Sequence, residues 1–460
     1  MISFTLASRK KEMTEALSEL LKIKSVKEDG DEMMPYGKNL FLALNNMLNL
    51  AERMYFDSES MFARLGYVDY GEGEEMLAIL THLDVVPEGA GWTVPAFSGL
   101  VKDGKIYGRG ALDNKGPAIA TLFALSAIQE DCITLKKRVR LIFGCDEESG
   151  WSDIAYYKKN GGEIPTMAFS PDAQFPIINA EKGLMQLELT KKADGANPED
   201  GLRLLSINGG ERVNVVPAYC ECVLSAKKAQ IKELADIFNA DVPVKIEMVE
   251  RGDGLHLITR GLSAHGSLPE EGRNAVNYMI AFLNTLPLAD SPLSQAVYQL
   301  AQYTGLQTDG TAMGIAQSDE LGALSLNVGY IKTDGGDVRV GIDIRYPVSG
   351  DGSSILDTIK EKMTAFAVEM KFEKPAHFVP EDSELVRGLK TAYEEIVGEK
   401  ASCLSTGGAT YARAFENAVA FGPVFPGKTG TEHQPDEYIE IDDLVKLADI
   451  ISNAIVTLCT

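Results

Sequence analysis

The chain has 460 residues, 45% of them hydrophobic, which is enough to bury a sizeable core and to form more than one domain. Its 44 basic and 67 acidic residues give a formal net charge of −23, which disfavours nucleic acid as a partner because such a surface repels phosphates. No apolar run approaches the roughly 18 residues of a membrane span, and the basic residues 9–11 follow the apolar start, the reverse of a signal peptide. We expect a cytoplasmic protein with no membrane partner.

The first part of the chain alternates between helical and strand patterns. Apolar residues recur at helical spacing over 11–23, and an alanine- and leucine-rich stretch predicts a helix over 116–128. Continuous apolar runs predict buried strands over 76–80, 139–143 and 167–169. The alternation predicts a mixed, mostly parallel sheet covered by helices on both faces, which is an α/β domain.

A different pattern fills the middle of the chain, from about 184 to 377. Amphipathic strands are predicted over 323–331 and 338–346, and helices over 273–286 and 355–367. The polar stretch 191–200 is predicted to be an exposed loop.

After residue 380 the earlier pattern returns. The elements predicted there are a helix over 385–396, a strand over 418–421 and a final helix over 441–458. We therefore expect one discontinuous domain of residues 1–184 and 378–460, with residues 185–377 inserted as an α+β domain.

The three predicted buried strands of the first domain end in histidine or acidic residues. His82 ends the first, Asp146-Glu147-Glu148 follows the second, and Asp172 follows the third. In open α/β sheets ligands bind outside the carboxyl ends of the strands, so these residues would converge on one crevice. Acidic residues also end strands simply by facing solvent, so the spacing supports a single site without proving one.

His82 and Asp84 lie two residues apart, so on an extended strand both side chains point to the same side. Asp84 can then orient the imidazole, as carboxylates do for metal-bound histidines. For this tripeptide alone, a strand-end histidine packed against a turn is an equally good interpretation.

Asp113 lies in a glycine-bounded turn before a predicted helix, where an aspartate is also a common cap. Capping is the stronger interpretation of this residue taken alone. A carboxylate at this point could instead bridge two cations roughly 3.5–4 Å apart.

Glu147 and Glu148 are adjacent acids that would repel each other without a compensating cation. One can bind a metal ion while the other stays free to move a proton, the usual division of labour in hydrolytic metal sites. A solvated acidic turn is the alternative.

Asp172 and His433 would complete a set of one histidine and one terminal carboxylate for each of two metal ions, in addition to a shared bridge. The mixed nitrogen and oxygen donors suit Zn²⁺, and also Mn²⁺ or Co²⁺. Taken alone, His433 would more often be an ordinary surface histidine.

The inserted domain offers His265, in the sequence Ser-Ala-His-Gly, and Arg345, at the end of an alternating strand. Either could meet the charge on a cleaved carbonyl or on a product carboxylate. Alternatively, His265 closes a turn and Arg345 pairs with Asp343. Gly407 and Gly408 precede a helical stretch and could form an anion cradle there, or a flexible loop.

Residues 422–429 match the phosphate-loop pattern GxxxxGK[ST], with Lys428 as its lysine. Two prolines remove backbone donors from this loop, and the residues after it are poor helix formers. We interpret the match as fortuitous.

The assembled motifs resemble those of the M20 family of co-catalytic metallopeptidases, most closely the PepV-type dipeptidases of bacteria, over nearly the whole chain. The matching segments are His-Leu-Asp-Val-Val-Pro at 82–87, Gly-Arg-Gly-Ala-Leu-Asp-Asn-Lys-Gly at 108–116, Asp-Glu-Glu-Ser-Gly at 146–150 and Ser-Pro-Asp-Ala at 170–173. The resemblance implies a zinc-peptidase-like catalytic domain and an enlarged lid domain.

The resemblance also implies a role for each site residue. His82 and Asp172 would bind one metal ion, Glu148 and His433 the other, and Asp113 both. The remaining roles fall to Glu147 as the general base, Asp84 as the residue that orients His82, His265 as the group that polarises the scissile carbonyl, and Asn214, Arg345, Gly407 and Gly408 as the substrate-binding residues.

Two further expectations follow from the family. A cis peptide bond is implied after the bridging aspartate, at Asp113-Asn114. The insertion 185–377 has 377 − 185 + 1 = 193 residues, about twice the size of the lid of the dimeric members, and a lid that can cover its own active site favours a monomer.

Together these features predict a cytoplasmic dipeptidase that uses two divalent metal ions, most simply Zn²⁺. It would hydrolyse short peptides with a free N-terminus, either Xaa-His or a broad range of dipeptides, with a metal-bridged water as the nucleophile. The alternative within the family is an amidohydrolase of N-acyl amino acids, a deacylase or desuccinylase. Rivals outside it are a nucleotide-binding protein that uses Lys428 and a non-catalytic carrier.

Overall fold

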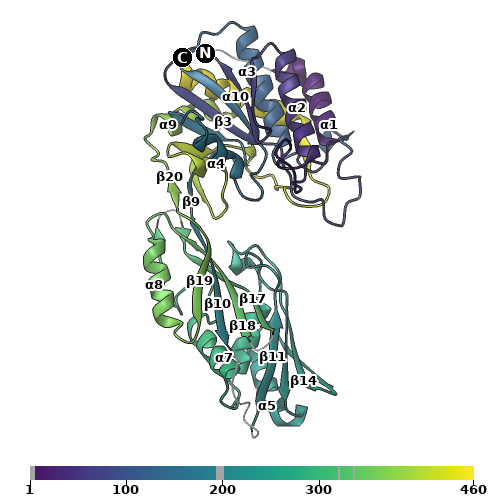
Figure 1. The fold of residues 1–460 in the computed structure, drawn as a ribbon, viewed down its shortest axis with the longest axis vertical. Coiled ribbons are helices and arrows are strands. Elements are labelled where there is room, and N and C mark those ends of the chain that lie inside the picture. Colours follow the sequence, from purple (N-terminus) through teal and green to yellow (C-terminus); the bar gives the residue numbers. More distant parts are fainter. Residues whose placement is uncertain (1–5, 193–200, 320–321, 335–336) are drawn as a thin grey trace. The chain divides into compact units, whose positions relative to one another are not determined.

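The computed structural model describes residues 6–192, 201–319, 322–334 and 337–460 (Figure 1). The chain divides into two compact units. Unit 1 comprises Met1–Ala180, Phe378–Leu404 and Ala409–Thr460, and unit 2 comprises Glu181–His377 and Ser405–Gly408. Most of the loop predicted over 191–200 lies outside the described residues. Within the described ranges, no helix is long and apolar enough to cross a membrane.

Unit 1 is built on a nine-stranded mixed sheet with the order β1-β2-β6-β3-β7-β22-β9-β20, in which β21 also pairs with β9. Its strands are β1 (Ser58–Met61), β2 (Leu65–Tyr70), β3 (Met76–His82), β6 (Arg138–Gly144), β7 (Met167–Ser170), β9 (Ile177–Glu181), β20 (His377–Phe378), β21 (Cys403–Thr406) and β22 (Ala418–Ala420). The central strands β6, β3, β7 and β22 run parallel, whereas β1, β2 and β9 pair antiparallel. The predicted mixed sheet with a mostly parallel centre is confirmed.

Helices cover both faces of this sheet. The helices of unit 1 are α1 (Lys10–Leu21), α2 (Lys38–Arg53), α3 (Lys115–Glu130), α4 (Ser152–Lys159), α9 (Glu384–Val397) and α10 (Ile441–Cys459), with the short η1 (Leu6–Arg9). Leu77 and Ile79 of β3 pack with α1, α2, α3, α9 and α10, whereas Ala78 and Leu80 pack with α4 on the other face. Because successive side chains of a strand point to opposite faces, this explains why β3 is buried along its whole length and apolar from Met76 to Leu80.

Two small sheets flank the carboxyl ends of the parallel strands. The first has the order β24-β5-β4 and joins β24 (Tyr438–Glu440) antiparallel to β5 (Lys105–Tyr107), which also pairs with β4 (Leu100–Lys102). The second pairs β23 (Pro423–Val424) with β8 (Ala173–Gln174). The β24–β5 pairing places the segment after His433 beside the segment before Asp113.

Unit 2 is an eight-stranded antiparallel sheet with the order β13-β14-β12-β11-β17-β18-β10-β19. Its elements are β10 (Gly183–Lys192), β11 (Arg203–Gly209), β12 (Tyr219–Ser225), α5 (Lys228–Asp241), β13 (Ile246–Arg251), β14 (Gly254–Arg260), η2 (Pro269–Glu271), α6 (Ala275–Leu283), α7 (Pro292–Tyr303), β15 (Ser318–Asp319), β16 (Gly322–Ala323), β17 (Ser325–Asp334), β18 (Asp337–Tyr346), α8 (Gly352–Lys362) and β19 (Ala367–Lys374). Alternate residues of β18 share one core with helices α5 to α8. This is the α+β organisation that the sequence predicts.

The helix predicted over 355–367 extends too far toward its C-terminal end. In the structure α8 ends at Lys362 and β19 begins at Ala367. The residues of β19 pair antiparallel with β10, so the hydrogen bonds of a sheet edge override the helical spacing of the apolar residues there.

Candidate metal centre

The site of unit 1 lies where the parallel strands end. β3 ends at His82, the turn after β6 carries Glu147 and Glu148, and the turn after β7 carries Asp172. Because β6, β3 and β7 are parallel neighbours, these turns lie at the same edge of the sheet. Asp113 reaches this edge from the turn before α3, and its peptide bond to Asn114 is cis, as expected.

The five residues predicted as metal ligands lie together, in two groups that share Asp113. In the first group, Nε2 of His82 lies 2.9 Å from Oδ1 of Asp113 and 3.6 Å from Oδ2 of Asp172. In the second, Nε2 of His433 lies 3.0 Å from Oδ2 of Asp113 and 3.1 Å from Oε1 of Glu148. Within each group the candidate ligand atoms lie within 4.8 Å of one another. The two oxygens of Asp113 thus face different histidines, as a bridging carboxylate requires.

The donor set fits divalent cations because buried negative charge accumulates here. Burial, and then the charge of Asp172, raises the pKa of Glu147 well above its usual value. Burial and the charge of Asp113 raise the pKa of Glu148 to about 7 and that of Asp172 to about 6. Cations at this site would relieve the repulsion among these carboxylates.

The two histidines are the only local source of positive charge among the ligand residues that the structure describes. Burial lowers the pKa of His433, but hydrogen bonds to Asp113 and Glu148 outweigh it and raise that pKa to about 11. Nε2 of His82 is buried and, despite its nearness to Asp113, has no hydrogen bond of acceptable geometry with any described residue. A buried imidazole nitrogen that faces carboxylates in this way is suited to a metal ion.

Asp84 lies beside His82, as predicted, and it also makes hydrogen bonds that the sequence did not predict. Its carboxylate accepts hydrogen bonds from the backbone N–H of Glu147 at 3.1 Å and of Glu148 at 3.0 Å. Nδ1 of His82 lies 3.0 Å from the backbone carbonyl oxygen of Asp84 and 3.4 Å from Oδ1 of its carboxylate. Asp84 therefore contacts both the imidazole ring and the turn that carries the two glutamates.

Several buried groups that support the ligands were not found by sequence reasoning. Asn114 donates from Nδ2 to Oδ1 of Asp172 at 3.0 Å and to the carbonyl of Pro171 at 2.7 Å. Asp153 accepts from the backbone N–H of Cys145 and Asp146, behind the glutamate turn. The one signal in the sequence was the position of Asn114 directly after the bridging aspartate.

The candidate substrate contacts all belong to unit 2, where they take part in two sets of hydrogen bonds. The carbonyl of Asn214 accepts a hydrogen bond from the N–H of Gly266, and Nδ1 of His265 lies 2.6 Å from Oγ of Ser267. Arg345 donates from Nε and Nη2 to Asp343, at 2.7 and 3.2 Å, and from Nη1 to the carbonyl of Gly407 at 2.6 Å. The Asp343 pairing that the sequence left open is therefore present, and it fixes the plane of the guanidinium.

The glycine pair differs from the predicted cradle at a helix start. The element that follows is η3 (Tyr411–Ala414), a four-residue 3-10 turn whose N-cap, Thr410, binds the N–H of Ala412 through its own hydroxyl. The N–H of Gly408 donates to Oγ1 of Thr406 at 3.0 Å. Since no α-helix follows, a helix dipole cannot supply the anion binding expected here.

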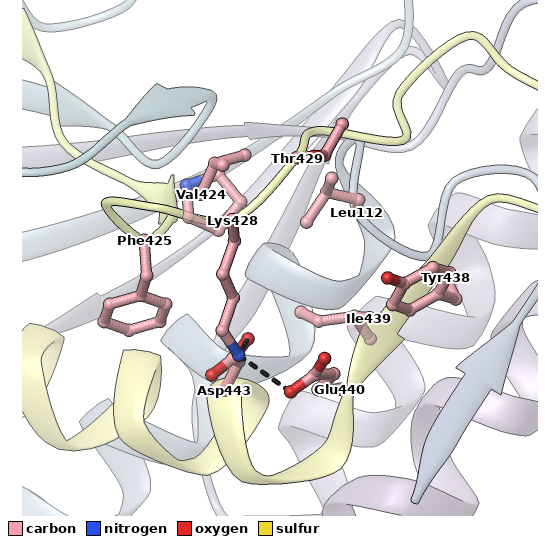
Figure 2. A pocket seen from close by; sticks show the side chains of 10 residues that line it. Leu112, Val424, Phe425, Lys428, Thr429, Tyr438, Ile439, Glu440 and Asp443 are labelled. Carbon is pink, nitrogen blue, oxygen red and sulfur yellow. Dashed lines mark hydrogen bonds and ion pairs between the residues drawn. The ribbon is translucent and has the colours of Figure 1, made fainter. Parts of the chain in front are cut away.

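Lys428 does not form a phosphate loop. It points toward Glu440 and Asp443 at one side of a pocket of about 250 Å³ (Figure 2), with Nζ 2.7 Å from Oε2 of Glu440 and 2.5 Å from Oδ2 of Asp443. The next described helix, α10, begins only at Ile441, so Lys428 lacks the helix start that a phosphate loop needs. Its charge is already neutralised by two carboxylates.

The chain is similar to known proteins both in sequence and in fold. Residues 78–457 match the family model described as peptidase family M20/M25/M40. A Bacillus subtilis (strain 168) protein named "Putative dipeptidase YtjP" is 37% identical over 453 residues, covering 97% of each chain. Two solved structures share the fold: human carnosine dipeptidase 1 (TM-score 0.61, 13% identity, 99% of both chains) and an aminoacylhistidine dipeptidase from Vibrio alginolyticus (TM-score 0.59, 14% identity, 96% of both chains).

Proposed function

Because the chain belongs to peptidase family M20/M25/M40 and is a metallopeptidase of that family, we propose that it is a dinuclear dipeptidase. Its substrates would be short peptides with a free N-terminus, either Xaa-His or a broad range of dipeptides. The observation that carries this proposal is Asp113, whose two carboxylate oxygens face His82 and His433. The buried Glu147 lies near enough to feel the charges of Asp113 and His82. The similarity to a relative named as a dipeptidase supports the choice of substrate class.

The proposed metal ligands are His82 and Asp172 for one ion, Glu148 and His433 for the other, and Asp113 for both. Zn²⁺ suits this mixture of imidazole and carboxylate donors best, with Mn²⁺ or Co²⁺ as replacements. When bound, such ions supply Lewis acidity to a carbonyl oxygen and a reactive water at neutral pH.

Glu147 is the proposed general base. Its Oε1 is buried and makes no hydrogen bond with any described residue, so this oxygen is available to a reacting group. Burial raises the pKa of Glu147 well above its usual value, which increases its affinity for a proton. Glu147 would take a proton from the attacking water and deliver it to the leaving amine.

Unit 2 is the proposed source of substrate contacts. His265 would stabilise the negative charge on the carbonyl oxygen, and Arg345, with Asn214, Gly407 and Gly408, would hold the C-terminal carboxylate of the substrate. Three of the five N–H donors of Arg345 bind described residues, which leaves two donors for a carboxylate.

We further propose that residues 1–184 and 378–460 act as the catalytic domain and residues 185–377 as a lid. A lid of this length favours a monomer that completes its own site.

A side-by-side assay separates this proposal from the N-acyl alternative. The Zn²⁺-loaded protein is supplied with free-amine dipeptides, including histidine-containing ones, and with N-acetyl and N-succinyl amino acids. Cleavage of the dipeptides supports the proposal. Cleavage of the blocked amino acids alone would replace the dipeptidase assignment with a deacylase or desuccinylase.

A further inference from the structure

The two segments of unit 1 that carry Asp113 and His433 are far apart in the sequence. Their positions relative to each other must be fixed if both residues are to bind the same metal ion. Asp113 ends the loop 108–113, and His433 lies in the segment 429–437, more than 300 residues later. His433 is in a turn, with a φ of 60° and half of its side chain exposed. A fully buried contact between this segment and the loop of Asp113 comes from Glu437, four residues further along.

Glu437 is completely buried and faces the loop of Asp113. Its Oε1 accepts hydrogen bonds from three backbone N–H groups, those of Gly110 at 3.0 Å, Leu112 at 3.0 Å and Asp113 at 3.2 Å. Its Oε2 accepts from Nη1 of Arg109 at 2.6 Å. The backbone carbonyl of the same residue accepts from the N–H of Gly108 at 2.9 Å.

Every backbone N–H of the loop 108–113 therefore has a partner, and Glu437 provides four of the six. The other two are those of Arg109, which binds the carbonyl of Ala96, and of Ala111, which binds the carbonyl of Gly108. The loop therefore depends largely on Glu437 for its shape, through three bonds to its carboxylate and one to its backbone carbonyl, because a buried N–H without an acceptor is costly.

We propose that Glu437 is a positioning residue that fixes Asp113 and His433 relative to each other, and thereby sets the occupancy of the metal position that they form with Glu148. Glu437 does not contact substrate or metal. It acts through the backbone of Asp113 on one side and through its own chain segment on the other. This inference rests on the proposed metal site.

The ion pair between Arg109 and Glu437 allows the proposal to be tested with a single and a double substitution. In Glu437→Gln the side chain keeps its size but carries one oxygen and one NH₂ group. Whichever way the amide turns, the NH₂ group meets donors, either the three backbone N–H groups or the guanidinium. In the double variant Arg109→Gln/Glu437→Gln, the amide oxygen can serve the backbone while the NH₂ group donates to the new glutamine.

The measurement is Zn²⁺ binding to metal-free protein by calorimetry, which needs no turnover. Loss of a residue that supports metal ligands typically costs about 10- to 100-fold in metal affinity. Glu437→Gln is expected to weaken the Zn²⁺ position that includes both Asp113 and His433 by that factor, and to weaken the other position, which shares only Asp113, by less. The double variant is expected to recover most of the loss.

Asp69→Asn is the matched control, because Asp69 pairs through both carboxylate oxygens with Arg140 elsewhere in unit 1. It should lower the melting temperature without changing either Zn²⁺ affinity. Equal Zn²⁺ affinities in wild type and Glu437→Gln, a double variant as weak as the single one, or an equal loss in Asp69→Asn would each overturn the inference. If the wild type itself binds no Zn²⁺, or binds it independently of Asp113, the proposed metal site fails instead.

Discussion

Glu147→Gln tests the proposed chemistry most selectively, since it removes the base and keeps the size of the side chain. A positioned general base typically contributes about 10²- to 10⁴-fold to the rate, which corresponds to about 3–5 kcal/mol in activation free energy. We expect turnover of a dipeptide to fall by that factor, with both metal ions still bound.

The same substitution should lower turnover but raise the stability of the folded, metal-free protein. Burial raises the pKa of Glu147, so ionisation of this group destabilises the folded, metal-free protein above the ordinary pKa of a glutamate. A neutral glutamine removes that cost together with the repulsion from Asp172 and Glu148. The melting temperature of metal-free Glu147→Gln at pH 8 is therefore expected to exceed that of the wild type.

The assay combines steady-state turnover, metal content by elemental analysis and thermal unfolding of the metal-free form. Glu148→Gln is the informative contrast, because it removes a proposed ligand and should lower metal content as well as rate. Turnover of Glu147→Gln within tenfold of wild type, with a full metal complement, would refute the assignment of the base. A loss of metal in Glu147→Gln would show instead that this residue is a ligand.

The remaining predictions concern the ligands, the pH dependence and the lid. His433→Ala should bind one metal equivalent fewer than the wild type by elemental analysis, and an unchanged metal content would contradict the proposed ligand set. The folded-state pKa values of Glu148, about 7, and Asp172, about 6, are raised above their unfolded values. Their contribution to stability is therefore complete below about pH 4 and is lost as pH rises to about 7, so metal-free protein should melt at a lower temperature at pH 8 than at pH 5. Saturating Zn²⁺ should reduce this difference, and a higher melting temperature of the metal-free protein at pH 8 would refute the argument. Arg345→Lys loses the bidentate pair that orients its guanidinium, so KM for a dipeptide should rise about tenfold or more with a smaller change in kcat; a change in kcat alone would exclude a role in carboxylate binding.

The sequence predicts the fold well where one physical rule dominates. Continuous apolar runs identify β3, β6 and β7 because strands buried on both faces need apolar residues at every position. The same rule places His82, Glu147, Glu148 and Asp172 at one sheet edge, since parallel strands end together. A local rule was thus sufficient for most of the candidate ligands.

Other features depend on contacts between distant segments, which periodicity does not encode. Glu437 directly follows the polar residues 429–436, yet it is completely buried because the pairing of β24 with β5 brings it onto the loop of Asp113. The end of α8 was misplaced for a similar reason, since the partner of β19 is the distant strand β10. Supporting residues of this kind carry no local pattern of their own.

The central claim is that this chain is a peptidase whose activity requires two metal ions held through Asp113. The most direct measurement is to strip the metals and titrate Zn²⁺ into the protein while following dipeptide hydrolysis, in the wild type and in Asp113→Asn. We expect no turnover without metal, full turnover at two equivalents, and no recovery in Asp113→Asn. Full turnover in the presence of a chelator, or at one equivalent with Asp113→Asn equally active, would contradict the requirement for two metal ions.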